Sequence, residues 1–229
     1  MIQLNNGKMS SCGQVSIERI RPIRMSSSKL FEILKRGLPL PSVDEFVRTW
    51  RLRNLRNLMR GFKRLAPAHL MGLAYFQGSL ELKFIPKGSL RPFDLGLVSL
   101  RVVTNNGVAY MVDAFQNTVE LENMKYHGFG VGTGNEAAAD AALGTELTTE
   151  YNPDSTRPTG STEEGATGNI FKTIATLTID AGTPAVTEHG VFSASSAGVL
   201  LDRSKFSAIN LSASDSIVST YQFTLAAGS

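Results

Sequence analysis

Residues 125–147 read KYHGFGVGTGNEAAADAALGTEL, and four glycines, Gly128, Gly130, Gly132 and Gly134, fall on every second position of this stretch. In an extended strand, this spacing places all four glycines on one face, which then carries no side chains. A bare face allows another strand, another subunit or a ligand to pack directly against the backbone. We therefore expect a strand here, with close backbone packing at these four glycines.

The sequence after this stretch has the pattern of short strands separated by polar turns. Residues 169–179 are rich in β-branched side chains, residues 185–192 and 199–203 read as a hairpin, and residues 215–225 alternate apolar and polar positions. Short strands joined by turns rich in Gly, Ser and Thr are typical of antiparallel sandwiches. This half of the chain therefore predicts an antiparallel β-sandwich.

The sequence before the glycines adds two strands and one short helix. Residues 80–85 alternate apolar and charged side chains, and residues 95–103 contain a second apolar run. Residues 108–116 instead have apolar side chains at helical spacing, and Thr104 or Asn105 can cap the helix that this spacing predicts. We expect the short helix to pack on the sheet.

A longer amphipathic helix is predicted over residues 43–65. Ser42 and Glu45 have the spacing of a capping box at its start, and Pro67 is expected to stop it. Its apolar residues recur at three- and four-residue steps, which predicts one buried stripe: Val43, Phe46, Val47, Trp50, Leu55, Leu58, Met59, Phe62 and Leu65. The other faces hold the arginines that we expect to bind a partner: Arg48, Arg51, Arg53, Arg56, Arg60 and Arg64.

The expected architecture is mainly β with an α-helical N-terminal region. Residues 1–27 lack a pattern that could build a core, and we expect an extended arm that is either a flexible terminus or a segment that orders on a partner. Residues 28–79 are expected to form a basic helical region, which includes a further short helix at 29–36. Residues 80–229 are expected to form the antiparallel sandwich, with one short helix near 105–116.

Charge is distributed unevenly along the chain. Residues 1–101 contain 18 Lys and Arg against 6 Asp and Glu, a net charge of +12, whereas residues 102–229 contain 5 against 14, a net charge of −9. This asymmetry indicates either that the two halves face different surroundings or that copies attract one another. The arginines also suit nucleic acid, but the sequence has no stacking, zinc or helix-turn-helix motif, which disfavours this partner. A basic amphipathic helix also suits a membrane surface, but nothing else in the sequence supports one, and no apolar run approaches the roughly 18 residues that span a bilayer.

Motifs for catalysis, cofactors and metals are missing from the sequence. The glycines match neither the dinucleotide fingerprint nor the phosphate-binding loop, and no Gly-x-Ser-x-Gly elbow is present. The three histidines, His69, His127 and His189, have no metal-ligand spacing, and we expect His127 and His189 to be structural. A single cysteine, Cys12, rules out an internal disulfide, so we expect a soluble protein made in a reducing cytoplasm. Because the motifs above are missing, we also expect that the protein is not an enzyme and uses no cofactor or metal.

Four segments carry a resemblance to a known class of proteins. Residues 126–147 combine a Gly-Thr-Gly strand end, a spacer of small residues and an Asp-x-Ala-Leu-x-Thr-Glu-Leu run. With VVTNNGVAYMVD at 102–113, VTEHGVF at 186–192 and GVLLDRSKF at 198–206, this order resembles structural proteins of tailed-bacteriophage virions. The resemblance covers residues 95–228, and no resemblance is found for residues 1–80.

The resemblance implies a structural role in a virion that is assembled in the cytoplasm of a bacterial host. The short chain, the basic first half and the lack of coiled-coil or fibre repeats favour a capsid decoration (cement) protein that grips the shell through its arm and helix. The implied partners are the major capsid protein or another virion protein, together with further copies of this chain, for example in a trimer. The alternatives are a tail, neck or fibre component and a carbohydrate-binding module for adsorption to the host.

Overall fold

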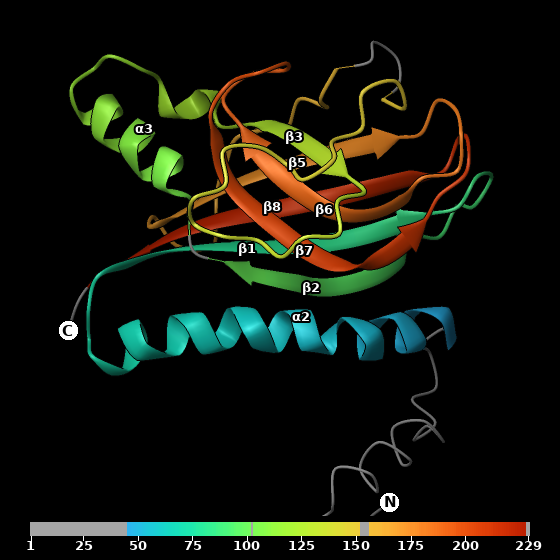
Figure 1. The fold of residues 1–229 in the computed structure, drawn as a ribbon, viewed down its shortest axis with the longest axis horizontal. Helices are drawn as coiled ribbons and strands as arrows, with labels where there is room; N and C mark the ends of the chain where they lie inside the picture. The colour runs from blue at the N-terminus through green and yellow to red at the C-terminus, as the bar shows by residue number, and fades with distance from the viewer. Residues whose placement is uncertain (1–44, 102, 152–155, 228–229) are drawn as a thin grey trace, which may run out of the picture. The chain divides into compact units, whose positions relative to one another are not determined.

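Two antiparallel β-sheets face each other and form a sandwich (Figure 1). The computed structural model describes residues 45–101, 103–151 and 156–227. All of these residues belong to one compact unit, Val43–Ser229, so the division expected between residues 79 and 80 falls inside it. The mainly β architecture with a helix in the N-terminal region confirms the predicted fold class. The arm expected at residues 1–27 and the helix expected at 29–36 lie outside the described residues.

The larger sheet has the strand order β2-β1-β8-β5-β4, and the smaller sheet has the order β3-β6-β7. The strands of the larger sheet are β1 (Tyr75–Ile85), β2 (Phe93–Arg101), β4 (Glu163–Glu164), β5 (Ile170–Thr178) and β8 (Ser216–Ala226). Those of the smaller sheet are β3 (Tyr126–Gly130), β6 (Ala185–Phe192) and β7 (Leu200–Asn210). Every named pair is antiparallel, so the predicted hairpin of β6 and β7 is confirmed.

The core lies between the two sheets and is built from alternating strand positions. Along β8, Ile217, Tyr221 and Phe223 are buried, as their period-two spacing predicts, whereas Leu225 is 42% exposed. The main apolar cluster joins Leu80 of β1 with Phe129 of β3, so it spans both sheets. Burial of these side chains supplies most of the favourable free energy of folding.

Helix α2 (Glu45–Leu70) runs along the side of the sandwich, next to β2 (Figure 1). The sequence predicted that Pro67 would stop this helix, but the helix continues through Pro67. Pro67 and Lys63 are exposed, so water can bond the carbonyl that proline leaves without its amide donor. The helix ends instead before Gly72, which has a positive φ of 62° and whose N–H bonds His69 O.

Helix α3 (Asn105–Phe115) confirms the short helix predicted from apolar spacing. Thr104 is its N-cap, and its hydroxyl oxygen accepts a hydrogen bond of 2.9 Å from the N–H of Gly107. The turn η1 (Leu121–Asn123) then leads into β3. The cap fixes the start of α3 beside β7, because the Thr104 hydroxyl also donates to Leu200 O at 2.6 Å.

Candidate functional site

Helix α2 is built into the edge of the sandwich. Strands β2 and β7 are the terminal strands of their sheets, and α2 contacts both. The indole N–H of Trp50 lies 3.1 Å from the carbonyl oxygens of Ser207 and of Ala208 in β7. Asn54 bridges the sheets, because its amide donates to Val98 O in β2 at 2.8 Å and its oxygen accepts from Ser207 N at 2.9 Å. Helix α2 therefore bonds strand-edge groups that lack a neighbouring strand.

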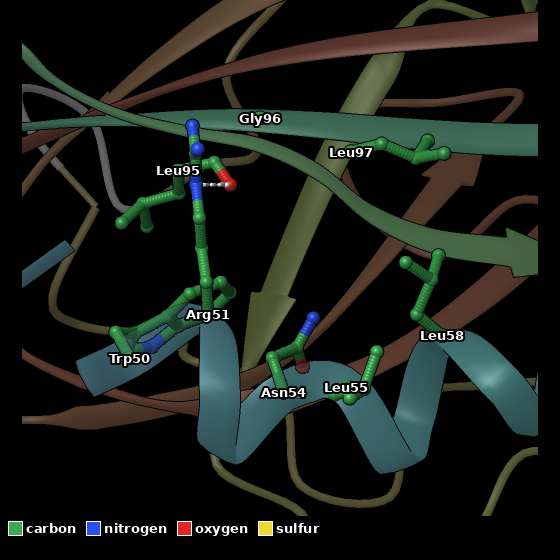
Figure 2. A pocket seen from close by; sticks show the side chains of 8 residues that line it. All are labelled: Trp50, Arg51, Asn54, Leu55, Leu58, Leu95, Gly96 and Leu97. Atoms are coloured by element: carbon green, nitrogen blue, oxygen red, sulfur yellow. Dashed lines mark hydrogen bonds between the residues drawn. The ribbon is translucent and has the colours of Figure 1, made fainter. Parts of the chain in front are cut away.

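A groove of about 320 Å³ lies between α2 and β2 (Figure 2). Arg51 crosses it, and its guanidinium donates to Leu95 O at 3.2 Å and to Asp94 O at 2.9 Å. Figure 2 shows this side chain rising from the helix to the strand. Leu55 and Leu97 line the groove and are 47% and 39% exposed, so an apolar surface reaches solvent beside the arginine.

The buried stripe predicted for α2 is only partly correct. The buried positions are Val47, Trp50, Asn54, Gly61 and Leu65. Val43, predicted to begin the stripe, lies outside the described residues. Four residues predicted to be buried are exposed instead: Phe46 (37%), Leu55 (47%), Met59 (46%) and Phe62 (57%). The reason is that α2 packs on a narrow seam at the sheet edges rather than across a sheet face. At Gly61 the backbone of α2 lies directly against the backbone of β2, because a Cβ at this position would lie only 2.0 Å from Leu100 O.

Three of the six arginines predicted to bind a partner have no side-chain partner among the described residues. The side chains of Arg48, Arg53 and Arg56 make no hydrogen bond or ion pair with any residue that the structure describes, and neither does that of Lys63. Arg53, Arg56 and Lys63 are exposed, and Arg48 is half-buried. Together with the exposed apolar residues of α2, these cations form what we call the outer face of α2: Arg48, Arg53, Leu55, Arg56, Met59, Phe62 and Lys63.

The other three arginines are held by the chain itself. Arg51 bonds β2 as described above, and Arg60 and Arg64 reach the carboxylate of Glu136 in the segment after β3. The distances from Arg60 Nε and Arg64 Nη1 to Glu136 Oε1 are 3.5 and 3.7 Å. These residues face the rest of the molecule, so the predicted site divides into an outer and an inner group.

Part of the bare glycine face is filled by the chain's own residues. A Cβ at Gly130 would lie 2.4 Å from Thr145 O, and a Cβ at Gly132 would lie 2.3 Å from Glu188 Oε1. Both distances are too short for any side chain without displacing a neighbour. The close packing at these two glycines is therefore with the segment around Thr145 and with β6.

The two outer glycines of the set behave differently from each other. A Cβ at Gly128 would lie 2.6 Å from the ring of Phe192, so this glycine is also closely packed. Gly134 is exposed, and a Cβ added there would meet no described atom within 4 Å, so the prediction of close packing is wrong at this position. Strand β3 ends at Gly130, so Gly134 no longer belongs to the alternating strand face.

Glu188 is the centre of a buried polar network. Its carboxylate is fully buried and accepts from Gly132 N (2.9 Å), Thr145 N (2.9 Å), Gly144 N (3.1 Å) and Arg203 Nη2 (2.6 Å). Burial alone would raise the pKa of Glu188, but these donors hold the pKa below its usual value. Its contribution to stability is therefore present at neutral pH and is lost in acid, below the ordinary value of 4.5.

His127 and His189 form a buried pair that sequence spacing did not reveal. Their ring atoms Nδ1 and Nε2 lie 2.9 Å apart, and His127 also contacts the hydroxyls of Thr173 at 3.1 Å and Ser219 at 2.8 Å. Burial lowers the pKa of His127 to about 3 and lowers that of His189 well below its ordinary value. The pairing of β3 with β6 brings the two rings together, whereas sequence spacing alone gives no such signal.

Asp202 on β7 is a third buried ionisable group. It is 1% exposed, and its carboxylate accepts a hydrogen bond of 3.2 Å from the Ser204 hydroxyl. Burial raises the pKa of Asp202 to about 7, although Arg101 nearby acts in the opposite direction. The carboxyl group is therefore protonated in mildly acidic solution, unlike an exposed aspartate.

These three groups predict how the free energy of unfolding depends on pH. Below pH 6.5 both histidines take up protons in the unfolded chain but not in the folded one, so stability falls with falling pH. Asp202 acts oppositely: its contribution is fully present below pH 3.8 and is lost as pH rises through about 7. Between about pH 4.5 and 6.5 the unfolded state binds one proton more than the folded state, two on the histidines against one on Asp202. The free energy of unfolding should therefore increase by about 1.4 kcal/mol for each unit by which the pH is raised.

The variant Asp202→Asn separates the two effects. Without the opposing carboxyl group, the slope between about pH 4.5 and 6.5 should double to about 2.7 kcal/mol per pH unit. Urea unfolding followed by circular dichroism at half-unit pH steps measures both slopes. An unchanged slope in the variant would contradict the assignment of a raised pKa to Asp202.

The described residues were also compared with the requirements of metal sites and membrane-spanning helices. Within the described ranges, no three His, Cys, Asp or Glu side chains gather in a way that could hold a metal ion. None of the described helices is both long and apolar enough to cross a membrane. Comparison with known protein-family models and with curated proteins finds no match to this chain.

Proposed function

We propose that this protein is a non-enzymatic structural component of a tailed-bacteriophage virion, and that it acts as a capsid decoration protein. In this proposal, the outer face of α2 binds the shell and the sandwich holds that face rigidly. The proposal rests on the resemblance carried by residues 95–228 and on one structural observation, the composition of the outer face. The arm at residues 1–27 belongs to the proposed contact but lies outside the described residues.

The outer face of α2 has the composition of a protein-binding surface. Met59 and Phe62 are 46% and 57% exposed, and the side chains of Arg53 and Arg56 beside them have no described partner. Aromatic residues, Met and Arg are the side chains enriched at protein interfaces. The cations favour an acidic partner surface, because attraction between opposite charges speeds association and fixes orientation.

The buried polar groups support a structural role rather than catalysis. Glu188 is bonded to backbone N–H groups and to Arg203, and His127 is bonded to His189 inside the core. These side chains are at most 6% exposed. Groups that are enclosed in this way hold loops and sheets in place, which suits a protein that must keep its shape on a particle.

Sedimentation with purified shells tests the proposal. Wild-type protein should bind expanded shells saturably, at a copy number that matches the shell lattice. The double variant Arg53→Glu/Arg56→Glu should weaken this binding by about tenfold or more, since each reversal places like charges at the contact. Raised salt should weaken the binding of the wild-type protein in the same direction.

The matched control is Lys87→Glu/Arg91→Glu on the hairpin between β1 and β2. These two residues are exposed cations that do not belong to α2, so the control makes the same change in net charge outside the outer face. It should bind shells as the wild-type protein does. Binding to tails alone would favour a tail or neck component, and equal loss in both double variants would show that net charge, not α2, drives attachment.

A further inference from the structure

A second pocket lies on the inner side of α2, away from the groove. It holds about 330 Å³ and is lined by Arg64, Arg101, Glu136, Ala137, Ala138 and Arg203. Its walls come from α2, the end of β2, the segment after β3, and β7. These four parts of the chain belong to one compact unit.

Positive charge exceeds negative charge around this pocket. Arg60, Arg64 and Arg101 all approach one carboxylate, that of Glu136, at 3.5, 3.7 and 3.2 Å. A single carboxylate neutralises only one of the three guanidinium groups. Arg203 also lines the pocket, but it meets two carboxylates, those of Glu188 and Asp140, at 2.6 and 2.9 Å. The four guanidinium groups therefore face three carboxylates, an excess of one positive charge. Asp202 near Arg101 offsets this excess only where it is ionised, and burial raises its pKa to about 7. The pocket therefore keeps an uncompensated positive charge.

Several charged groups at the pocket are buried without full hydrogen bonding. Arg101 is 2% exposed, and its Nε has no hydrogen-bond partner among the described residues. Within the described part of the chain, the buried Nε of Arg60 also lacks a hydrogen-bond partner, and neither carboxylate oxygen of Glu136 accepts a hydrogen bond. Buried polar atoms in folded proteins are nearly always bonded, so unbonded cationic donors beside a cavity indicate room for an acceptor.

We propose that this pocket binds a small oxyanion, a carboxylate or a phosphate group, between Arg64 and Arg101. Guanidinium groups bind both oxyanions through paired N–H donors, and a partly enclosed site strengthens such bonds. A bound anion would neutralise the excess charge and supply an acceptor for Arg101, which lines the pocket. The inference does not depend on the proposed virion role, since it rests on the pocket alone.

Anion titrations of the whole chain test the proposal. Inorganic phosphate, sulfate and acetate are added at constant ionic strength, with chloride as the reference, and are followed by thermal unfolding and calorimetry. At least one oxyanion should raise the unfolding temperature saturably, with one site per chain. A response to phosphate and sulfate alone assigns a phosphate site, and a response that includes acetate assigns a carboxylate site.

Three variants separate specific binding from general screening. Arg64→Gln should weaken the affinity by about tenfold or more, because a charge-assisted pair of donors is lost. Arg53→Gln, an exposed arginine of the same helix that does not line the pocket, should leave the affinity unchanged. Glu136→Gln should tighten binding, because it removes the carboxylate that competes for the arginines.

Two results would overturn the proposal. One is an equal response to chloride and to every oxyanion, which would show ionic screening around a water-filled pocket. The other is wild-type affinity in Arg64→Gln or unchanged or weaker affinity in Glu136→Gln. A gain of anion affinity in Glu136→Gln cannot arise from damaged folding, so this variant distinguishes a binding site from a merely structural cluster.

Discussion

Replacing Glu188 with glutamine is expected to lower the free energy of unfolding by about 3–5 kcal/mol, since it leaves a buried guanidinium without its main counter-charge. Glutamine has almost the same shape, so the loss reports charge and hydrogen bonding rather than packing. Its amide nitrogen would also face N–H donors such as those of Gly144 and Thr145. Urea unfolding at pH 7, followed by circular dichroism, measures the change.

The control for this variant is Glu81→Gln on β1. Glu81 is exposed and its side chain makes no hydrogen bond or ion pair with the described part of the chain, so its replacement should alter stability by no more than about 0.5 kcal/mol. A loss below about 1 kcal/mol in Glu188→Gln would mean that Asp140, which lies 2.9 Å from Arg203, satisfies the arginine alone. Such a result would show that the charge of Glu188 is not the main stabilising contribution to the network.

The strands of the sandwich could be predicted because their signal is local. Ile217 and Tyr221 alternate with polar residues, and period-two spacing marks the core side of a strand whichever strands lie beside it. The helical spacing of α2 was equally clear, but the spacing does not indicate how many of its apolar side chains the sheets bury. Leu55 and Phe62 remain exposed because the helix meets two sheet edges along a narrow seam.

The polar networks could not be predicted, because their members are distant in sequence. Glu188 and Thr145 are separated by 43 residues, and His127 and His189 by 62. Alternation along a strand places adjacent residues such as Glu188 and His189 on opposite faces. It carries no information on which segment meets each face, since strand order and loop closure decide that. The same limit applies to Gly134, where the strand pattern continues in the sequence after the strand has ended.

Replacing Trp50 with alanine is expected to lower the free energy of unfolding by about 3–5 kcal/mol. The side chain is 1% exposed and belongs to the main core cluster, so its removal leaves a cavity between α2 and both sheets. The indole N–H bond to β7 is lost as well, and it leaves Ser207 O and Ala208 O without this donor. Because this is the only tryptophan of the chain, unfolding must be followed by circular dichroism rather than by tryptophan fluorescence.

Two further variants keep this prediction testable if Trp50→Ala does not fold. Trp50→Phe keeps an aromatic ring but no N–H donor, so its loss should be smaller, about 1–2 kcal/mol. Phe62→Ala, on the outer face of the same helix, should alter stability by no more than about 0.5 kcal/mol. Wild-type stability in Trp50→Phe and Trp50→Ala would show that α2 is peripheral to the fold. If the proposed shell contact is correct, Phe62→Ala should instead weaken attachment to shells, because the inner residues of α2 hold the sandwich together and the outer residues meet the partner.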